Sequence, residues 1–317
     1  MESARPVLAL DIGGTKLAAG VVDASGEVRS FVVAPTPDGP EAGLARLWEL
    51  GREAVADSGV GWPAIAAVGI ACGGPLDPRR GILVSPPHLP GWRNLPVVAM
   101  AEHVYGRPAA LHNDATAAAA GEHRFGAGAG TRNLVYLTLS TGVGGGVVVE
   151  NRLYDGAAGN GGELGHVTVD WRGRFCRSCG RRGCLEAYVS GTSIAERARE
   201  AAGESGDSQL LAGATAADVA AAAEAGDAVA RRVWDETIEA LACGLTSIVN
   251  LFEPELVVLG GGVTRAGDKL LAPVRERVRT DAMAPAAEAA SIVISPFGDR
   301  VGVVGAAAIG FERAEAA

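Results

Sequence analysis

One pattern occurs twice in the chain and limits what it can fold into: an apolar strand, a glycine-rich turn and a second apolar strand. The first copy is VLALDIGGTKLAAGVVDASGEV, residues 7–28, with a further turn at residues 24–26 into a third strand. The second copy is LVYLTLSTGVGGGVVVENRLYDG, residues 134–156. One such unit in each half predicts a duplicated α/β architecture with a nucleotide in the cleft between the halves. The alternative is two unrelated hairpins.

The first glycine turn is a candidate phosphate-binding loop. Gly13 and Gly14 can bring backbone N–H groups against phosphate oxygens, with Thr15 and Lys16 adjacent. Asp11 ends the strand before the turn, a natural position for a carboxylate that holds Mg²⁺ through water. The spacing matches neither a P-loop nor a dinucleotide-binding fingerprint, and a glycine turn that binds nothing is the alternative.

The segment around Asp114 reads as a strand that runs into an alanine-rich helix. Residues 109–111 form the expected strand, and the helix follows His112 and Asn113. Asp114 then occupies the helix N-cap position, and capping alone is one interpretation. A carboxylate at such a junction also points into the cleft of a two-domain α/β chain, where it could accept a proton from a sugar hydroxyl that attacks phosphorus.

Between residues 162 and 186 the sequence predicts a metal site. Cys176, Cys179 and Cys184 lie within nine residues, and His166 precedes them by ten. Three thiolates and one imidazole complete a tetrahedral shell for structural Zn²⁺. A redox pair at the first two cysteines and a chance cluster of buried thiols are the alternatives.

Two glutamates flank this cluster. Glu163 lies three residues before His166, and Glu186 lies two after Cys184. A closed zinc site does no chemistry of its own, but it can fix carboxylates that accept hydrogen bonds from sugar hydroxyls. A third glycine run at residues 260–262 follows an apolar strand, and there an adenine could lie flat on the backbone. A plain strand-to-helix turn is the alternative.

Composition excludes several classes of protein. The chain has 317 residues, a formal charge of −9, 48% hydrophobic and 21% charged residues. This balance predicts two folded domains and argues against a general nucleic-acid or membrane surface. No signal peptide or membrane span is recognisable, so clustered thiols fit a metal site in a reducing cytoplasm. Cys72 and Cys243 stand in apolar surroundings and are expected to be core residues.

The remaining elements follow from periodicity and turn residues. Helices are expected at residues 41–58, 96–105, 192–203, 215–225, 227–250 and 301–313. Buried strands are expected at residues 64–71 and 291–295, and residues 255–271 are expected to form a strand, the third glycine turn and a helix.

These segments resemble the ROK family of bacterial sugar kinases and sugar-responsive repressors over nearly the whole chain. The resemblance rests on LALDIGGTK, GIACGGPLD, HLPGW, HNDATAAAAGE, STGVGGG, GELGH, CGRRGCLE and VVLGGG. It implies an actin-like, ribonuclease-H-like fold of two α/β lobes with a duplicated βαβ core and a structural zinc site. The expected lobes are residues 1–111 together with the C-terminal helix 301–317, and residues 112–300.

The resemblance also implies roles for individual residues. Asp114 is the implied catalytic base. The implied sugar contacts are Gly74, Asn113, Asp114, Glu163, His166 and Glu186. The implied nucleotide and Mg²⁺ region holds Asp11, Gly13, Gly14, Thr15, Lys16, Thr141, Gly142, Gly144 and Gly261. The implied zinc ligands are His166, Cys176, Cys179 and Cys184.

Three positions depart from the family pattern. The family's first two cysteines read Cys-x-Cys, whereas two residues separate Cys176 from Cys179 here. His88 stands where the family has Asn, near the expected sugar, and Gly73 stands where it favours proline. These departures put Cys176 as a ligand, and the choice of sugar, in question.

The function implied by the resemblance is an ATP-dependent kinase for the 6-hydroxyl of a hexose, with glucose as the expected sugar. One alternative is an N-acetylmannosamine or N-acetylglucosamine kinase, because His88 and the space near Gly73 could accommodate an acetamido group. Another is a sugar-sensing protein without activity. Only about ten residues precede Asp11, too few for a helix-turn-helix that would read DNA. A homodimer or homotetramer is expected from the resemblance alone.

Overall fold

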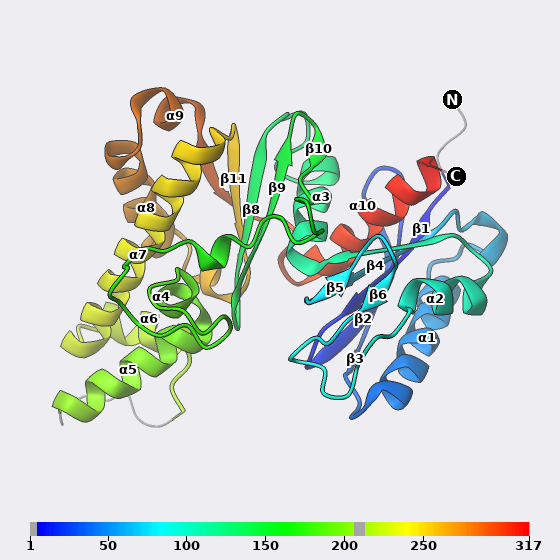
Figure 1. The fold of residues 1–317 in the computed structure, drawn as a ribbon, viewed down its shortest axis with the longest axis horizontal. Coiled ribbons are helices and arrows are strands. Elements are labelled where there is room, and N and C mark those ends of the chain that lie inside the picture. The colour runs from blue at the N-terminus through cyan, green and yellow to red at the C-terminus, as the bar shows by residue number, and fades with distance from the viewer. Residues whose placement is uncertain (1–4, 206–212, 317) are drawn as a thin grey trace.

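The computed structural model describes residues 5–205 and 213–316. The chain forms two halves, each built on a mixed five-stranded sheet (Figure 1). The first half contains the earlier strands together with the last helix of the chain. The second half contains the middle helix and the later strands and helices, without that last helix (Figure 1).

The first sheet has the strand order β3-β2-β1-β4-β7. Strands β1 and β2 are antiparallel, as are β2 and β3, whereas β4 and β7 run parallel to β1. The bounds of these strands are β1 Val7–Ile12, β2 Lys16–Val22, β3 Val28–Pro35, β4 Val68–Cys72 and β7 Ala109–Asn113. A short hairpin, β5 Leu76–Asp77 with β6 Ile82–Leu83, leaves the end of β4.

The second sheet repeats this arrangement with the order β10-β9-β8-β11-β12. Again the first three strands form an antiparallel meander, and the last two run parallel to the central strand β8. Its strands are β8 Leu134–Leu139, β9 Val143–Val149, β10 Arg152–Leu153, β11 Leu256–Gly260 and β12 Ser291–Ile294. The duplication predicted from the two glycine patterns is therefore confirmed.

The helices enclose both sheets in layers. In the first half α1 Pro40–Asp57 and α2 Val97–Tyr105 pack on the face that carries Leu8 and Leu10, whereas α10 Val301–Glu315 packs on the face that carries Val7 and Ala9. Neighbouring residues of β1 thus contribute to different cores, as the alternation of side chains along a strand requires. In the second half α3 Asp114–Phe125 packs on β8 and β9.

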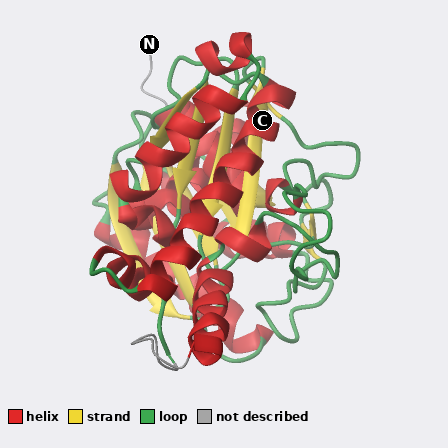
Figure 2. Cartoon of the chain, turned by 90° about the vertical axis from the view of Figure 1, so that its left-hand side faces the viewer, coloured by secondary structure: helices red, strands yellow, loops and turns green. Residues whose placement is uncertain are grey.

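The opposite face of the second sheet is covered by the remaining helices, which lie in front of its strands in Figure 2. They are α4 Glu186–Val189, α5 Gly191–Ser205, α6 Ala216–Glu224, α7 Ala228–Phe252, α8 Asp268–Asp281 and α9 Ala284–Ala289. Four single 3₁₀ turns complete the described part of the chain: Trp62–Ala64, Leu164–His166, Gly262–Ala266 and Gly298–Arg300.

The two halves meet where α3 crosses α10. A Cβ atom on Gly121 would lie 2.9 Å from the Cα of Gly305, and one on Gly305 would lie 2.6 Å from the carbonyl carbon of Ala117. Only glycine permits such a close approach of two helix backbones. The alanine-rich sequence of α3 serves the same contact, because small side chains let both sheets lie close to one helix pair.

Four sequence expectations differ from the structure. Strand β4 begins at Val68 rather than at residue 64, because Trp62–Ala64 forms a 3₁₀ turn. After the third glycine turn another 3₁₀ turn delays α8 to Asp268. Cys72 is buried as expected, but Cys243 lies on the exposed side of α7. Asp114 does not cap α3, because Asn113 does.

The predicted lobe boundaries stay a prediction, and residues 1–4 and 317 of the first predicted lobe lie outside the described residues. Within residues 5–205 and 213–316, no helix combines the length and the apolar composition that crossing a bilayer requires.

Candidate active site between the two glycine turns

Asp114 is the first residue of α3 and directly follows the end of β7. The N-cap is Asn113, whose Oδ1 accepts hydrogen bonds from the backbone N–H groups of Ala115 at 3.0 Å and Thr116 at 3.3 Å. Because Asn113 takes the capping role, the Asp114 carboxylate needs only its 2.8 Å bond from Ala115 and keeps acceptor capacity for a ligand. The Asn113 Nδ2 atom faces Gly74, where a Cβ would lie 3.7 Å away.

The carboxylates of Asp11 and Asp114 lie near each other at the carboxyl ends of β1 and β7. Burial, then the negative charge of Asp114, raises the pKa of Asp11 to about 7, and Lys16 acts in the opposite direction. Loss of solvation also raises the pKa of Asp114, although the residue is exposed at the surface. The hydrogen bond from Ala115 N–H and the charge of His88 lower this pKa. The negative charge of each carboxylate is thus disfavoured by burial, and a hard cation such as Mg²⁺, which prefers oxygen ligands, would stabilise both charges.

Helix α10 fixes Asp11 from the other side. A Cβ on Gly302, in the first turn of α10, would lie 2.2 Å from Oδ2 of Asp11. The carboxylate therefore rests against the bare backbone of the helix start. Sequence reasoning missed Gly302, because nothing in VGVVGAA distinguishes this glycine from the one that packs on α3.

The first glycine turn is closed by a hydrogen bond from Gly13 N to Lys16 O at 3.0 Å. Thr36 donates from Oγ1 to Gly13 O at 2.7 Å, and its backbone N–H donates to Thr15 O at 3.1 Å. Gly14, Thr15 and Lys16 are exposed, so the turn is free to meet a ligand. Thr36 is a second residue that sequence reasoning missed, because it acts from the end of β3.

The second glycine turn is held by different contacts. Ser140 N donates to Gly142 O at 2.9 Å, and Gly191 N donates to Ser140 O at 2.7 Å. Glu186 Oε2 accepts from Val143 N at 2.9 Å and leaves no room for a Cβ on Gly142, which would lie 2.8 Å away. Glu186, predicted to contact sugar, therefore also ties the turn to the cysteine segment.

The glycines of this region also serve packing. A Cβ on Gly144 would lie 2.8 Å from that of Ala115, so β9 lies close against the start of α3. Gly261 has φ +88°, and its Cβ would meet Leu139 O at 2.4 Å, which places the third glycine turn beside the end of β8. Gly144 and Gly261 thus lie near the second glycine turn and the start of α3, as a shared nucleotide site would require. Their contacts with phosphate and adenine stay predictions.

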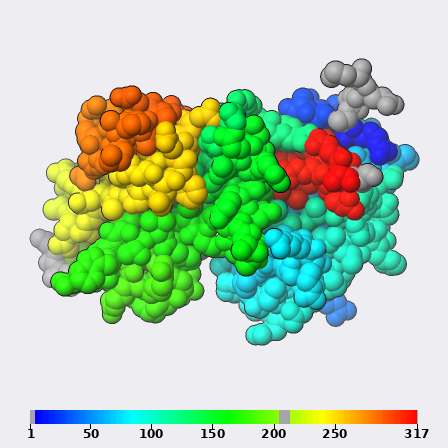
Figure 3. All heavy atoms as spheres, turned by 45° about the horizontal axis from the view of Figure 1, so that its top comes forward, coloured from blue at the N-terminus to red at the C-terminus, as the bar shows by residue number. Residues whose placement is uncertain are grey.

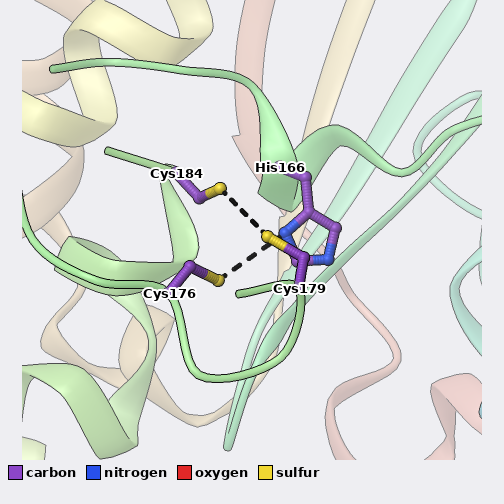
Figure 4. Close-up of side chains that lie close together, drawn as sticks. All are labelled: His166, Cys176, Cys179 and Cys184. Atoms are coloured by element: carbon purple, nitrogen blue, oxygen red, sulfur yellow. Dashed lines mark hydrogen bonds between the residues drawn. The ribbon is translucent and has the colours of Figure 1, made fainter. Parts of the chain in front are cut away.

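The four predicted zinc ligands converge (Figure 4). Their ligand atoms all lie within 4.8 Å of one another. Cys179 Sγ lies 3.5 Å from Cys184 Sγ, and Cys176 Sγ lies 3.8 Å from His166 Nδ1. Tetrahedral Zn²⁺ with thiolate bonds near 2.3 Å places its sulfurs roughly 3.8 Å apart. The donor set and spacing fit zinc, and Cys176 lies in the cluster despite the extra residue before Cys179.

His166 faces two ways. Its Nδ1 points to the sulfurs, while its Nε2 lies 3.9 Å from Glu163 Oε2. Burial raises the pKa of Glu163, the charge of His166 lowers it, and the charges of Asp114 and Glu186 raise it further. Because charges act on a pKa only over short distances, the cysteine segment, the predicted sugar-binding carboxylates and the predicted base lie in one region.

The halves also touch directly. His112, at the end of β7, bonds through Nε2 to Asp155 Oδ1 at 3.0 Å, and this bond lowers the pKa of Asp155. In the space-filling view the lower edge of the molecule is notched where residues of the second half meet those of the first (Figure 3). Sequence reasoning missed the His112–Asp155 pair, because the partners are 43 residues apart and belong to no motif.

The sequence model of the ROK family matches residues 7–312. The chain belongs to the ROK family. Its two sheets of identical strand order, joined by crossing helices, form an actin-like α/β fold of the kind found in ROK kinase structures.

Individual relatives agree over almost their full length. A glucokinase from Thermotoga maritima is 38% identical over 97% of this chain and 98% of its own. An N-acetylmannosamine kinase from Citrobacter koseri is 36% identical over 95% of this chain and 97% of its own. The crystal structure of a Streptomyces griseus ROK glucokinase in complex with glucose and AMPPNP superposes with a TM-score of 0.79 at 33% identity, covering 97% and 99% of the two chains.

Proposed function

We propose that this ROK protein is an ATP-dependent hexose 6-kinase whose sugar is glucose. The observation that carries the proposal is the position of Asp114. This carboxylate stands at the β7–α3 junction, near Asp11 of the first glycine turn and Glu163 of the cysteine segment. The T. maritima and S. griseus relatives, both glucokinases, support the choice of sugar.

Each group then has a role. Asp114 accepts the proton of the sugar 6-hydroxyl as that oxygen attacks the terminal phosphorus of ATP, and ADP leaves as the bond to the bridging oxygen breaks. Mg²⁺ would be held at Asp11 and would neutralise charge on the transferring phosphoryl group. The backbone N–H groups and Lys16 of the first turn, with Thr141 and Gly142 of the second, would contact the phosphates.

The sugar would lie on the side of the cysteine segment. Asn113 Nδ2, Glu163 and the Nε2 atom of His166 offer donors and acceptors for hydroxyl groups, and Gly74 gives close access to backbone. Zn²⁺ held by His166 Nδ1 and three thiolates would be structural: it would fix the ring of His166 so that its other nitrogen faces the sugar.

A panel of sugars and phosphoryl donors, with release of ADP or of shortened polyphosphate as readout, tests the proposal. We expect phosphorylation of glucose with ATP and dependence on Mg²⁺. A clear preference for N-acetylmannosamine or N-acetylglucosamine would favour the second candidate, which the 36% identity to the C. koseri kinase supports. Absence of turnover with every sugar, together with measurable sugar binding, would favour a sensor without activity.

Asp114→Asn is the first variant to make. It keeps the shape of the side chain and removes the proton acceptor, so kcat should fall by about a thousandfold while glucose binding stays within about threefold. Asp77→Asn, a change of the same kind in the hairpin strand β5, is the matched control and should keep kcat. Equal loss of binding and turnover would contradict the role of Asp114 as base.

Other features of the proposal rest on the family resemblance. A cytoplasmic location and a homodimer or homotetramer are the expectations, and nucleic-acid and membrane partners are not expected. Size-exclusion chromatography with light scattering tests the oligomer.

A further inference from the structure

Gly73, His88 and the predicted base Asp114 lie close together. Gly73 directly follows β4, and an atom at the position of its missing Cβ would lie 3.5 Å from His88 Cδ2, 3.7 Å from His88 Nε2 and 3.9 Å from Asp114 Oδ2. All three distances are ordinary van der Waals contacts. The face of Gly73 that lacks a side chain is therefore bordered by a ring nitrogen of His88 and by a carboxylate oxygen of Asp114.

The loop that carries His88 is fixed, although the imidazole itself is exposed. Leu89 N donates to Pro86 O, and Trp92 N donates to Leu89 O, both at 3.1 Å. The Leu89 and Trp92 side chains are buried in the core of the first half, with 4% and 1% of their surface exposed. His88 is therefore not a core residue, and its place beside Asp114 is set by its neighbours.

The same loop rests on the first glycine turn. A Cβ on Gly14 would lie 2.6 Å from both Cβ and the carbonyl oxygen of His88. The backbone of His88 thus touches the predicted phosphate loop, and its side chain borders the space beside the predicted base. The residue stands where a phosphoryl donor and an acceptor would meet.

We propose that His88 is a positioning residue that holds the reacting hydroxymethyl group of the hexose against Asp114, in the space at Gly73. This inference rests on the proposed hexose kinase function. The hydroxyl donates its proton to Asp114, and His88 Nε2 forms a hydrogen bond to the same oxygen. Two such bonds fix the direction of the oxygen toward phosphorus. The proton passes to Asp114 while the new O–P bond forms and the bond between the terminal phosphorus and the bridging oxygen of ATP breaks, so that ADP leaves. His88 keeps its own protonation state.

Substitution of His88 tests this role. His88→Ala should lower kcat for glucose by about tenfold or more, with KM for ATP within about twofold, because only the orientation of the hydroxyl is lost. His88→Asn and His88→Gln each retain a hydrogen-bonding side chain, and at least one should recover a large part of kcat. His103→Ala, which removes an exposed imidazole from α2, is the matched control and should leave both constants unchanged.

Gly73→Ala tests the space independently of the imidazole. Its methyl group would meet His88 and Asp114 at ordinary contact distances and Gly73 has no left-handed φ, so the fold and ATP binding should be preserved. Because the imidazole of His88 borders this space where the family has Asn, the added methyl group would narrow the room left for the hydroxymethyl group, and kcat/KM for glucose should fall by about tenfold or more. Thermal unfolding and ATP titration confirm that the variant is folded.

The outcomes separate the two proposals. A wild-type protein that phosphorylates no hexose contradicts the proposed function. A wild-type protein that phosphorylates a hexose, with His88→Ala and Gly73→Ala both within twofold of its kcat/KM, overturns the role of His88 alone. Loss of activity in His88→Ala without recovery in either amide variant also overturns it, because a hydrogen bond would not be what was lost.

Discussion

The two glycine turns share one topology but are held in place by different means. Each follows the central strand of its sheet, β1 or β8, and leads into an antiparallel neighbour. The penultimate residue of β1 is Asp11, whereas that of β8 is Thr138. Duplication has kept the strand order of the halves and let their chemistry diverge: only the first turn carries a carboxylate at this position.

The anchors diverge as well. The first turn is fixed within its own half by Thr36, and by Gly302 of the last helix, which supports Asp11. The second turn is fixed by Glu186, whose other carboxylate oxygen, Oε1, bonds to Ser178 within the cysteine segment. A metal in that segment would therefore stabilise the second turn. The first turn would be stabilised by its own hydrogen bonds and packing, without help from the metal.

Loss of the metal ligand should have the largest effect. Cys184 is fully buried, and Cys184→Ser exchanges a thiolate for a poor zinc ligand of nearly the same size. We expect zinc content to fall and the free energy of unfolding to drop by on the order of 5 kcal/mol, because metal binding stabilises the folded segment. Metal analysis and thermal unfolding measure both. Hydrogen exchange should rise in the second glycine turn more than in the first.

Cys243→Ser is the matched control, since this cysteine is exposed on α7 and lies outside the cluster. It should leave zinc content and stability unchanged. Uniform loss of protection in both glycine turns of Cys184→Ser would show that the metal supports the whole molecule rather than its second half.

The carboxylate of the first turn should give stability a characteristic pH dependence. The folded pKa of Asp11 is raised to about 7 from 3.8. Between these values the folded state holds a proton that the unfolded chain has lost, so this group's stabilisation is complete below about pH 4 and is lost as pH rises through 7. The upper limit of the change is roughly 4 kcal/mol.

Asp11→Asn removes that titration. Without Mg²⁺, the stability of wild type relative to Asp11→Asn should fall between pH 4 and pH 8, and added Mg²⁺ should reduce the fall. Denaturant unfolding at several pH values measures the difference between the two proteins, in which the contributions of other groups cancel. A difference that does not vary with pH would contradict the raised pKa.

The repeated part of the fold was accessible from sequence, because strand–glycine–strand patterns report local backbone needs. The three strands of the first meander, the first two strands of the second and the cluster of His166 with three cysteines were predicted from the sequence, whereas the short strand β10 was not. The N-cap of α3 was assigned to Asp114 instead of Asn113, since both residue types cap helices and only the backbone conformation distinguishes them. Cys243 was misplaced because an apolar helix sequence does not reveal which side faces solvent.

What sequence could not provide was contact between distant segments. Gly302 against Asp11, Glu186 against Val143 and His88 beside Asp114 each join elements that are far apart in the chain. Such pairs depend on the relative placement of loops at the ends of the two sheets, and no local pattern encodes that placement.

Crowding Asp11 should disturb the first turn specifically. Gly302→Ala would place a methyl group 2.2 Å from Oδ2 of Asp11, so the carboxylate or the start of α10 must move, at a cost of about 2 kcal/mol. Activity should become more dependent on Mg²⁺ concentration, with zinc content unchanged. Gly203→Ala is the control, since its methyl group would meet nothing within 4 Å. If the Mg²⁺ dependence of Gly302→Ala is unchanged, Asp11 does not hold Mg²⁺.

The smallest expected effect comes from cutting the link between the second turn and the cysteine segment. Glu186→Ala removes the acceptor of the Val143 N–H, and a single hydrogen bond of this kind to a charged group contributes about 1.5 kcal/mol. KM for ATP should therefore rise by about tenfold. Because Glu186 is also a predicted sugar contact, KM for glucose is measured as well. Glu163→Ala is the comparison, since the Glu163 carboxylate lies beside His166 Nε2 at 3.9 Å, and it should raise KM for glucose alone. If Glu186→Ala and Glu163→Ala have the same effect on both constants, Glu186 acts through the sugar, and the second turn is held by Ser140 and Gly191 without help from the cysteine segment.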